Sequence, residues 1–127
     1  MNKKMNIVIV GLGNIGSYFY NYLRKNKDVI FNKTNTIPNI LFVSAKSFSK
    51  KRKFHLSKKI WLKNYLAATK MKNVDIVVEL IGGAEGPAKK LVFDALKNKK
   101  HVITANKALV SKYGDQLAKI AEKNKVN

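Results

Sequence analysis

Four short runs of apolar residues recur along the chain and predict four β-strands. They cover residues 6–10, 40–45, 74–81 and 101–104. The first run, Asn-Ile-Val-Ile-Val, is nearly all apolar and rich in β-branched residues. Such runs are typical of parallel strands that are covered on both faces, because the side chains that alternate between the two faces must then all be apolar.

Between these runs, apolar residues recur at helical spacing. After the first strand this spacing predicts a helix that ends at Arg24. Three further helices are predicted, at 60–69, 87–98 and 108–123. Pro87 suits the first position of its helix, and Gly114 is a candidate break in the last one.

Strands that alternate with helices indicate an α/β fold with a parallel sheet and right-handed crossovers. We predict an open sheet of about four strands with helices on both faces. Residues 26–39 contain Asn, Thr and a proline and are predicted to be mostly a connection. Residues 46–53 are polar and basic and are predicted to be a loop.

The length of 127 residues predicts one domain, residues 1–127. The chain has no cysteine, which excludes disulfides and thiolate metal sites, and we predict no metal site. The sequence contains neither a signal peptide nor a run of roughly 18 apolar residues. We therefore expect a cytoplasmic protein without a membrane partner.

The formal net charge of +19 raises the question of a nucleic-acid partner. Nearly all of this charge is lysine spread along the whole chain, and only Arg24 and Arg52 are arginines. Bidentate recognition of phosphates and bases favours arginine. The two interpretations are a nucleic-acid binder and a solvated lysine surface. The composition favours the second, and we expect no nucleic-acid partner.

A glycine-rich turn follows the first predicted strand and consists of Gly11, Leu12, Gly13, Asn14, Ile15 and Gly16. This G-x-G-x-x-G pattern between a strand and an amphipathic helix is typical of a Rossmann-like dinucleotide-binding domain. The first glycine would permit the turn, the second the approach of a pyrophosphate, and the third close packing of helix on strand. The helix N-terminus would attract the phosphates. The competing interpretation is a glycine turn with a structural role only.

The acidic residue that usually accompanies this pattern is missing. It would follow the glycines by about 20 positions and bind ribose hydroxyls, yet no Asp or Glu lies between Asp28 and Asp75. The second strand is followed instead by Lys46, Ser47 and three cations at 50–52. Such cations can pair with a 2′-phosphate. We therefore predict NADP as the cofactor, with NAD as the alternative if the lysines are only solvated.

Two further segments lie at predicted strand ends, where open parallel sheets bind ligands. They are Val-Val-Glu-Leu-Ile-Gly-Gly at 77–83 and Thr-Ala-Asn-Lys-Ala-Leu at 104–109. Together with the glycine turn, in this order and at this spacing, they resemble the homoserine dehydrogenase family. The resemblance implies interconversion of homoserine and aspartate semialdehyde with NAD(P), a reaction of threonine and methionine biosynthesis. Because of the lysines after the second strand, we expect the reaction to depend on NADP.

The resemblance also assigns roles to two lysines. Lys107 matches the family's lysine beside the nicotinamide and the substrate, so it is the candidate catalytic residue and a cofactor contact. Lys46 matches a basic residue associated with the 2′-phosphate, although the family often has arginine there. The predicted cofactor site is therefore the glycine turn with Lys46 and Lys107. Glu79 is interpreted as a residue that caps or orients backbone, and the competing interpretation of Lys107 is a surface lysine.

In the family that this sequence resembles, a substrate domain follows the cofactor domain, and a full dinucleotide fold usually has six strands. We therefore expect an incomplete fold, the cofactor-binding fragment of the enzyme, inactive by itself and with the strand at 101–104 as an exposed sheet edge. The whole enzyme is expected to act on a small molecule and to be a homo-oligomer. The alternative function is a stand-alone dinucleotide-sensing module without catalysis.

Overall fold

A computed structural model describes residues 3–127. Its elements in chain order are β1 (Lys3–Val10), α1 (Asn14–Lys25), α2 (Lys27–Thr34), β2 (Thr36–Ser44), the short 3-10 helices η1 (Lys58–Ile60) and η2 (Tyr65–Lys70), β3 (Ile76–Glu79), α3 (Pro87–Lys97), β4 (His101–Thr104) and α4 (Lys107–Asn124). The predicted alternation of strands and helices is present, with α2 as an additional helix.

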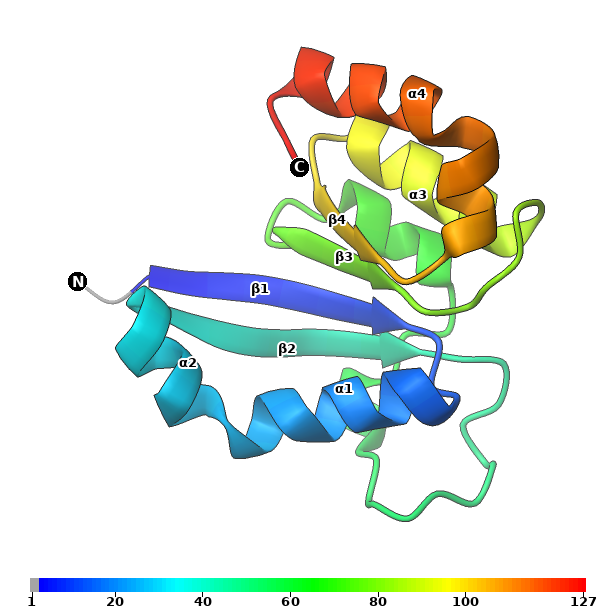
Figure 1. Cartoon of the computed structure of the whole chain (residues 1–127). Helices are drawn as coiled ribbons and strands as arrows, with labels where there is room; N and C mark the ends of the chain where they lie inside the picture. Colours follow the sequence, from blue (N-terminus) through cyan, green and yellow to red (C-terminus); the bar gives the residue numbers. More distant parts are fainter. Residues whose placement is uncertain (1–2) are drawn as a thin grey trace.

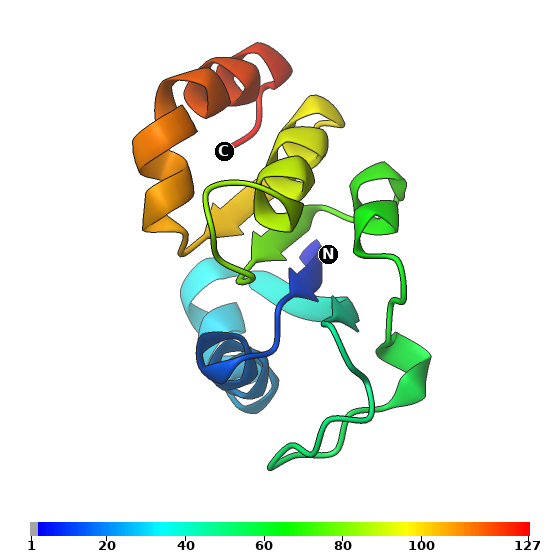
Figure 2. The same cartoon turned by 90° about the vertical axis from the view of Figure 1, so that its right-hand side faces the viewer.

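The four strands form one parallel sheet in the order β2-β1-β3-β4. Figure 1 shows α1 and α2 on one side of the sheet and α3 and α4 on the other, with α4 packed on α3. The predicted open four-stranded α/β sheet with helices on both faces is thus confirmed. Because the strands are parallel, their carboxyl ends all lie at the same end of the sheet. We call this end the carboxyl edge, as distinct from the edge strands β2 and β4, and Figure 2 looks onto it.

Strand β1 illustrates why the predicted strands are almost continuously apolar. Ile7 and Ile9 point into the core beneath α1, whereas Val8 and Val10 point into the core beneath α3. All four residues are at most 5% exposed. Each such side chain contributes about 2 kcal/mol to stability through burial. Since both faces of the strand are covered, a polar residue at any of these positions would be buried.

The prediction that residues 26–39 are mostly a connection is wrong. The segment contains α2 and the first part of β2. Helix α2 buries no side chain, and its apolar residues 29–31 are consecutive, so no helical periodicity marks it. Pro38 argues against a central strand, but β2 is an edge strand of the sheet and Pro38 pairs with Met5 of β1, at a position where proline is tolerated.

The predicted helix at 60–69 is also wrong, because most of this segment is an extended stretch and the 3-10 helix η2. Trp61 forms a parallel bridge with Val43 of β2. Its ring packs edge-on against Phe48, with the ring centroids 5.3 Å apart. This tertiary contact outweighs the local helical spacing. Helix α4, by contrast, continues through Gly114 without a break.

Strand β4 forms the other edge of the sheet, as predicted. The Val102 N–H donates to the Asn127 carbonyl at 2.8 Å, so the last residue lies beside the start of this strand. Ile103 remains 48% exposed.

Within residues 3–127, no helix combines the length and apolar character needed to cross a membrane. In the same range no group of three or more His, Cys, Asp or Glu residues is placed to hold a metal ion.

Candidate functional site

The segments that follow β1, β3 and β4 meet at the carboxyl edge of the sheet (Figure 2). The glycine turn lies between two neighbouring strand ends. The Gly11 N–H donates to the Ser44 carbonyl at the end of β2, and the Leu80 N–H donates to the Val10 carbonyl, both at 2.8 Å. The turn therefore occupies the middle of this edge, with the basic loop after β2 on one side and the segments after β3 and β4 on the other.

Packing requires two of the glycines in the turn. Gly11 has φ +107°, and a Cβ there would lie 2.5 Å from the backbone carbon and oxygen of Leu80. A Cβ on Gly16 would lie 1.9 Å from the Gly11 carbonyl oxygen. Both contacts are with backbone atoms, which cannot rotate away as a side chain can. These two glycines therefore serve the turn and the close packing of α1 on the sheet.

Neither packing nor backbone conformation requires the remaining glycine, Gly13. Its φ of −74° is accessible to any residue. A Cβ at this position would have no heavy atom within 4 Å among the residues of the structure. Gly13 is the N-cap of α1, and no side chain among residues 3–127 caps this helix end. Free N–H groups beside an open space suit a phosphate, so the residues present fit the pyrophosphate of a dinucleotide.

The basic loop after β2 forms as predicted, but its cations differ in what they contact. The Arg52 guanidinium donates to the carbonyls of Ser47, Phe48 and Lys50 at distances of 2.8, 3.1 and 3.2 Å. These bonds close the loop and engage the arginine with the backbone. Lys46 lies two residues beyond the end of β2 and is exposed. Lys46 is therefore better placed than Arg52 to meet an anion beside the glycine turn.

A buried polar network joins the ends of β3 and β4. Glu79, the last residue of β3, is 0% exposed. Its Oε2 accepts from the N–H groups of Ile81 and Gly82 at 2.8 and 2.9 Å. Its Oε1 accepts from the Thr104 hydroxyl at 2.5 Å. Glu79 thus orients the loop after β3, as predicted, and that loop begins earlier than expected because β3 ends at Glu79 rather than at Ile81.

Asn106 extends this network to the start of α4. Its N–H donates to the Thr104 hydroxyl at 3.0 Å, and its Nδ2 donates to the Gly83 carbonyl at 2.6 Å. Its Oδ1 caps α4 by accepting from the Leu109 N–H at 3.0 Å. Neither Thr104 nor Asn106 was expected from the sequence to have a role of its own. The preference of Asn for helix N-caps is the signal that identifies Asn106.

Lys107 is the first residue of α4 and is exposed at the carboxyl edge of the sheet. It follows Asn106 directly, so the polar network fixes its backbone. A cation at a helix N-terminus meets the positive end of the helix dipole, which costs roughly 0.3–1 kcal/mol. The ion pairs within residues 3–127 involve other lysines. Neither the helix dipole nor an ion pair with the described residues therefore stabilises Lys107 at this position.

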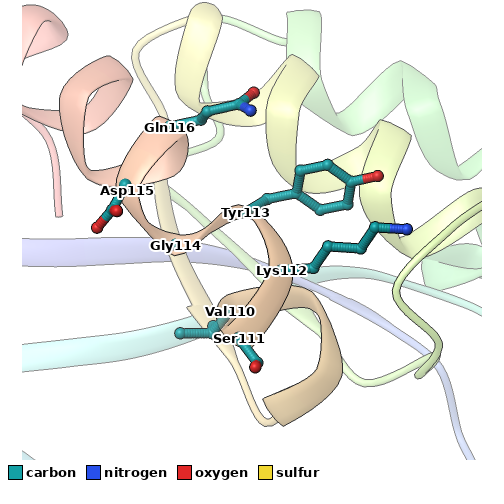
Figure 3. A pocket seen from close by; sticks show the side chains of 7 residues that line it. All are labelled: Val110, Ser111, Lys112, Tyr113, Gly114, Asp115 and Gln116. Atoms are coloured by element: carbon teal, nitrogen blue, oxygen red, sulfur yellow. The ribbon is translucent and has the colours of Figure 1, made fainter.

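A second polar cluster ties the segment before α3 to α4. The Glu85 carboxylate accepts from Lys112 Nζ at 2.7 Å, from Lys89 Nζ at 3.3 Å, and from the Tyr113 hydroxyl. In Figure 3, Lys112 and Tyr113 point to the same side of α4. The residues labelled in Figure 3 line a pocket. Its volume is about 250 Å³. Consecutive residues of this one helix, 110–116, line it, and it includes none of the residues at the carboxyl edge described above.

This cluster predicts a low pKa for Glu85. Donation by Lys112, and then by Tyr113, lowers the pKa of the carboxyl from 4.5 to about 2. Because the folded-state pKa is the lower one, the stabilisation is fully present above about pH 4.5 and is lost as the pH falls through about 2. An NMR titration of the Glu85 carboxyl carbon should give a midpoint well below 4.5, and Lys112→Met should raise it. A wild-type midpoint at the ordinary glutamate value would mean that the cluster does not form in solution.

The fold and the carboxyl edge together define a class of protein. An open parallel sheet carries a glycine turn at the middle of this edge, and the turn leads into a helix whose N-terminus has no side-chain cap. Gly13 leaves open space in front of that N-terminus. These are the features of a Rossmann-like dinucleotide-binding domain.

Comparison with known proteins identifies the family. Residues 11–127 match the family model described as homoserine dehydrogenase, NAD binding domain. The chain is 34% identical to the homoserine dehydrogenase of Bacillus subtilis, covering 96% of this chain and 28% of that protein. It is 36% identical to the enzyme of Neisseria gonorrhoeae, covering 98% of this chain and 28% of that protein. The chain therefore belongs to the homoserine dehydrogenase family, as its NAD-binding domain, and the resemblance found in the sequence is confirmed.

Solved structures agree with this assignment. The crystal structure of S. aureus homoserine dehydrogenase at pH 8.5 matches with a TM-score of 0.89 and 35% identity. The match covers 99% of this chain and 31% of that chain. The sequence thus spans less than a third of the length of the relatives and structures reported above.

Proposed function

We propose that this chain binds NADP, and NAD more weakly, as the cofactor-binding portion of a homoserine dehydrogenase. The main support for the proposal is the environment of Gly13 at the N-terminus of α1. Neither packing nor backbone conformation requires a glycine there, and no side chain of the described residues caps the helix. The proposed cofactor contacts are the glycine turn 11–16, Lys46 and Lys107. A bound nicotinamide supplies or accepts a hydride. The substrates of the whole enzyme would be homoserine and aspartate semialdehyde.

The strand order supports an arrangement in which the two halves of the cofactor lie on opposite sides of the glycine turn. In this fold class the pyrophosphate binds at the helix N-terminus after β1, and the adenosine ribose lies at the end of the next strand along the chain. That strand is β2, which leads to Lys46. The nicotinamide half would then lie on the opposite side, over the ends of β3 and β4. Lys107 stands on that side.

The position of Lys107 supports a role in binding or catalysis over that of an incidental surface lysine. Its charge is unfavourable at the start of α4, so stability gives no reason to keep it there. Close to the nicotinamide, a cation would stabilise negative charge on a substrate oxygen.

The isolated chain is expected to bind cofactor without oxidising homoserine. Homoserine-dependent formation of NADPH by the purified chain would contradict this expectation.

The NADP assignment predicts a preference that depends on Lys46. NADPH should bind at least about tenfold more tightly than NADH, because a charge-assisted hydrogen bond to the 2′-phosphate contributes about 1.5–3 kcal/mol. Fluorescence titration with both cofactors measures this ratio. Lys46→Ala should remove most of it by weakening the binding of NADPH alone.

The matched control is Lys123→Ala, which removes the same charge from the last turn of α4 and should leave both affinities unchanged. Equal binding of NADH and NADPH by the wild-type chain would contradict the NADP assignment. A preference for NADPH that persists in Lys46→Ala would contradict the role of Lys46.

A further inference from the structure

The proposed cofactor contacts leave the buried carboxylate of Glu79 without a role. Glu79 is 0% exposed. Within residues 3–127 its hydrogen-bond donors are two backbone N–H groups and one hydroxyl, and none of them is a cation. Burying a carboxylate costs several kcal/mol unless its oxygens receive hydrogen bonds. An apolar residue at the end of β3 would be buried without this desolvation cost. We therefore look for the role of Glu79 in the groups that its carboxylate holds in place.

On the β3 side, the carboxylate holds a loop that would otherwise have many conformations. Gly82 and Gly83 have φ values of +93° and +85°. Two consecutive glycines are flexible, and fixing them in one conformation is entropically unfavourable. The two bonds from Glu79 Oε2 to the N–H groups of Ile81 and Gly82 fix the start of this loop.

On the β4 side, the same carboxylate acts through a hydroxyl. The Thr104 hydroxyl donates to Glu79 and accepts from the Asn106 N–H, so both of its hydrogen-bonding directions are set. Asn106 in turn donates to the Gly83 carbonyl and caps α4. The bonds therefore form a closed ring that runs from Glu79 through Thr104 and Asn106 to Gly83 and returns along the loop.

This ring lies entirely on one side of the glycine turn. Its members come from the ends of β3 and β4 and from the residue before Lys107. On the other side, the turn is joined to the end of β2 by the bond from the Gly11 N–H to the Ser44 carbonyl, in which the ring takes no part. The ring borders the turn where Gly11 packs against the Leu80 backbone. Loss of the ring should therefore disturb the half of the cofactor that lies over β3 and β4 and leave the β2 side in place.

We propose that Glu79 is a positioning residue for the nicotinamide half of the cofactor. Through Thr104 and Asn106 it holds the loop after β3 and the first residue of α4 in one arrangement, so that Lys107 and the loop offer an ordered surface. The adenosine half, on the β2 side, binds independently of Glu79. This inference rests on the proposed function, because it requires a dinucleotide at the carboxyl edge.

The test compares a whole cofactor with its adenosine half. NADPH and adenosine 2′,5′-bisphosphate are titrated into the wild-type chain and into Thr104→Val, which removes the hydroxyl but keeps the shape of the side chain. Thr104→Ser restores the hydroxyl and serves as the rescue variant. Thr69→Val is the control, since it removes the hydroxyl of another threonine, one that is buried and donates to the Leu66 carbonyl in η2. Glu79→Gln is the second probe, with circular dichroism to confirm folding.

The expected result is a split between the two ligands. Thr104→Val and Glu79→Gln should weaken NADPH about five- to tenfold, as expected for lost hydrogen bonds, and leave adenosine 2′,5′-bisphosphate unchanged. Thr104→Ser and Thr69→Val should behave like the wild-type chain. A parallel loss of both ligands, or no loss of either, would overturn the inference. A wild-type chain that binds neither ligand would instead overturn the proposed function. If Glu79→Gln does not fold, the two Thr104 variants decide the outcome.

Discussion

Alanine in place of Gly16 should destabilise the chain by at least about 3 kcal/mol, which is a large part of the stability of a domain this size. The added Cβ would lie 1.9 Å from the Gly11 carbonyl oxygen. Relieving that clash requires α1 to move away from the sheet, and with it the apolar residues that α1 buries. Chemical denaturation followed by circular dichroism would measure the loss.

The matched control is Gly114→Ala, which also replaces a glycine inside a helix. Its Cβ would lie 3.5 Å from a methyl group of Val110, an ordinary contact. This variant should be about 0.5–1 kcal/mol more stable than the wild-type chain, because alanine is the better helix former. If Gly16→Ala were as stable as Gly114→Ala, α1 would not pack on the glycine turn as described.

Gly13→Ala should mainly reduce the affinity for NADPH, whereas Gly16→Ala should mainly reduce stability. Stability should fall by no more than about 1 kcal/mol, the cost of alanine at an N-cap, because no heavy atom of the described residues lies within 4 Å of the added Cβ. Affinity for NADPH should fall at least about tenfold, since the methyl group occupies the space through which a pyrophosphate reaches the N–H groups of α1. A fluorescence titration together with a denaturation curve on the same sample would separate the two effects.

Gly114→Ala again serves as the control and should bind NADPH like the wild-type chain. Unchanged binding by Gly13→Ala would remove the observation on which the proposed function depends. A large loss of stability would show that Gly13 has a structural role, which is the competing interpretation of the glycine turn.

The hydrophobic pattern predicted those elements whose side chains face the core at regular intervals. The second half of β1 was predicted because burial on both faces leaves a continuous apolar run, although the strand begins at Lys3, three residues earlier than expected. β4 was predicted at its observed bounds from its short apolar run. Helix α2 was missed because it buries no side chain and so carries no periodic signal. The helix predicted at 60–69 failed because Trp61 pairs with Val43, a contact between residues distant in sequence.

The strand-end segments of the candidate site could be predicted, because their position follows from the sheet topology. The side-chain hydrogen bonds between them could not be predicted. Parallel strands bring their carboxyl ends together, so the glycine turn and the two later segments were expected to share one edge. The partners of Glu79 and Glu85 could not be inferred in this way. Thr104 lies 25 residues from Glu79, and Lys112 lies 27 residues from Glu85. In a chain this rich in lysine, the sequence does not distinguish the one lysine that completes such a cluster.

The central claim is that a nicotinamide dinucleotide binds across the carboxyl edge of this sheet, at the N-terminus of α1. The most direct test is an amide NMR titration of the chain with NADPH. The predicted result is saturable shifts concentrated at residues 11–16, 82–83 and 104–107. Shifts confined to other surfaces, such as the α4 pocket at 110–116, or no saturable shifts at all, would contradict the claim.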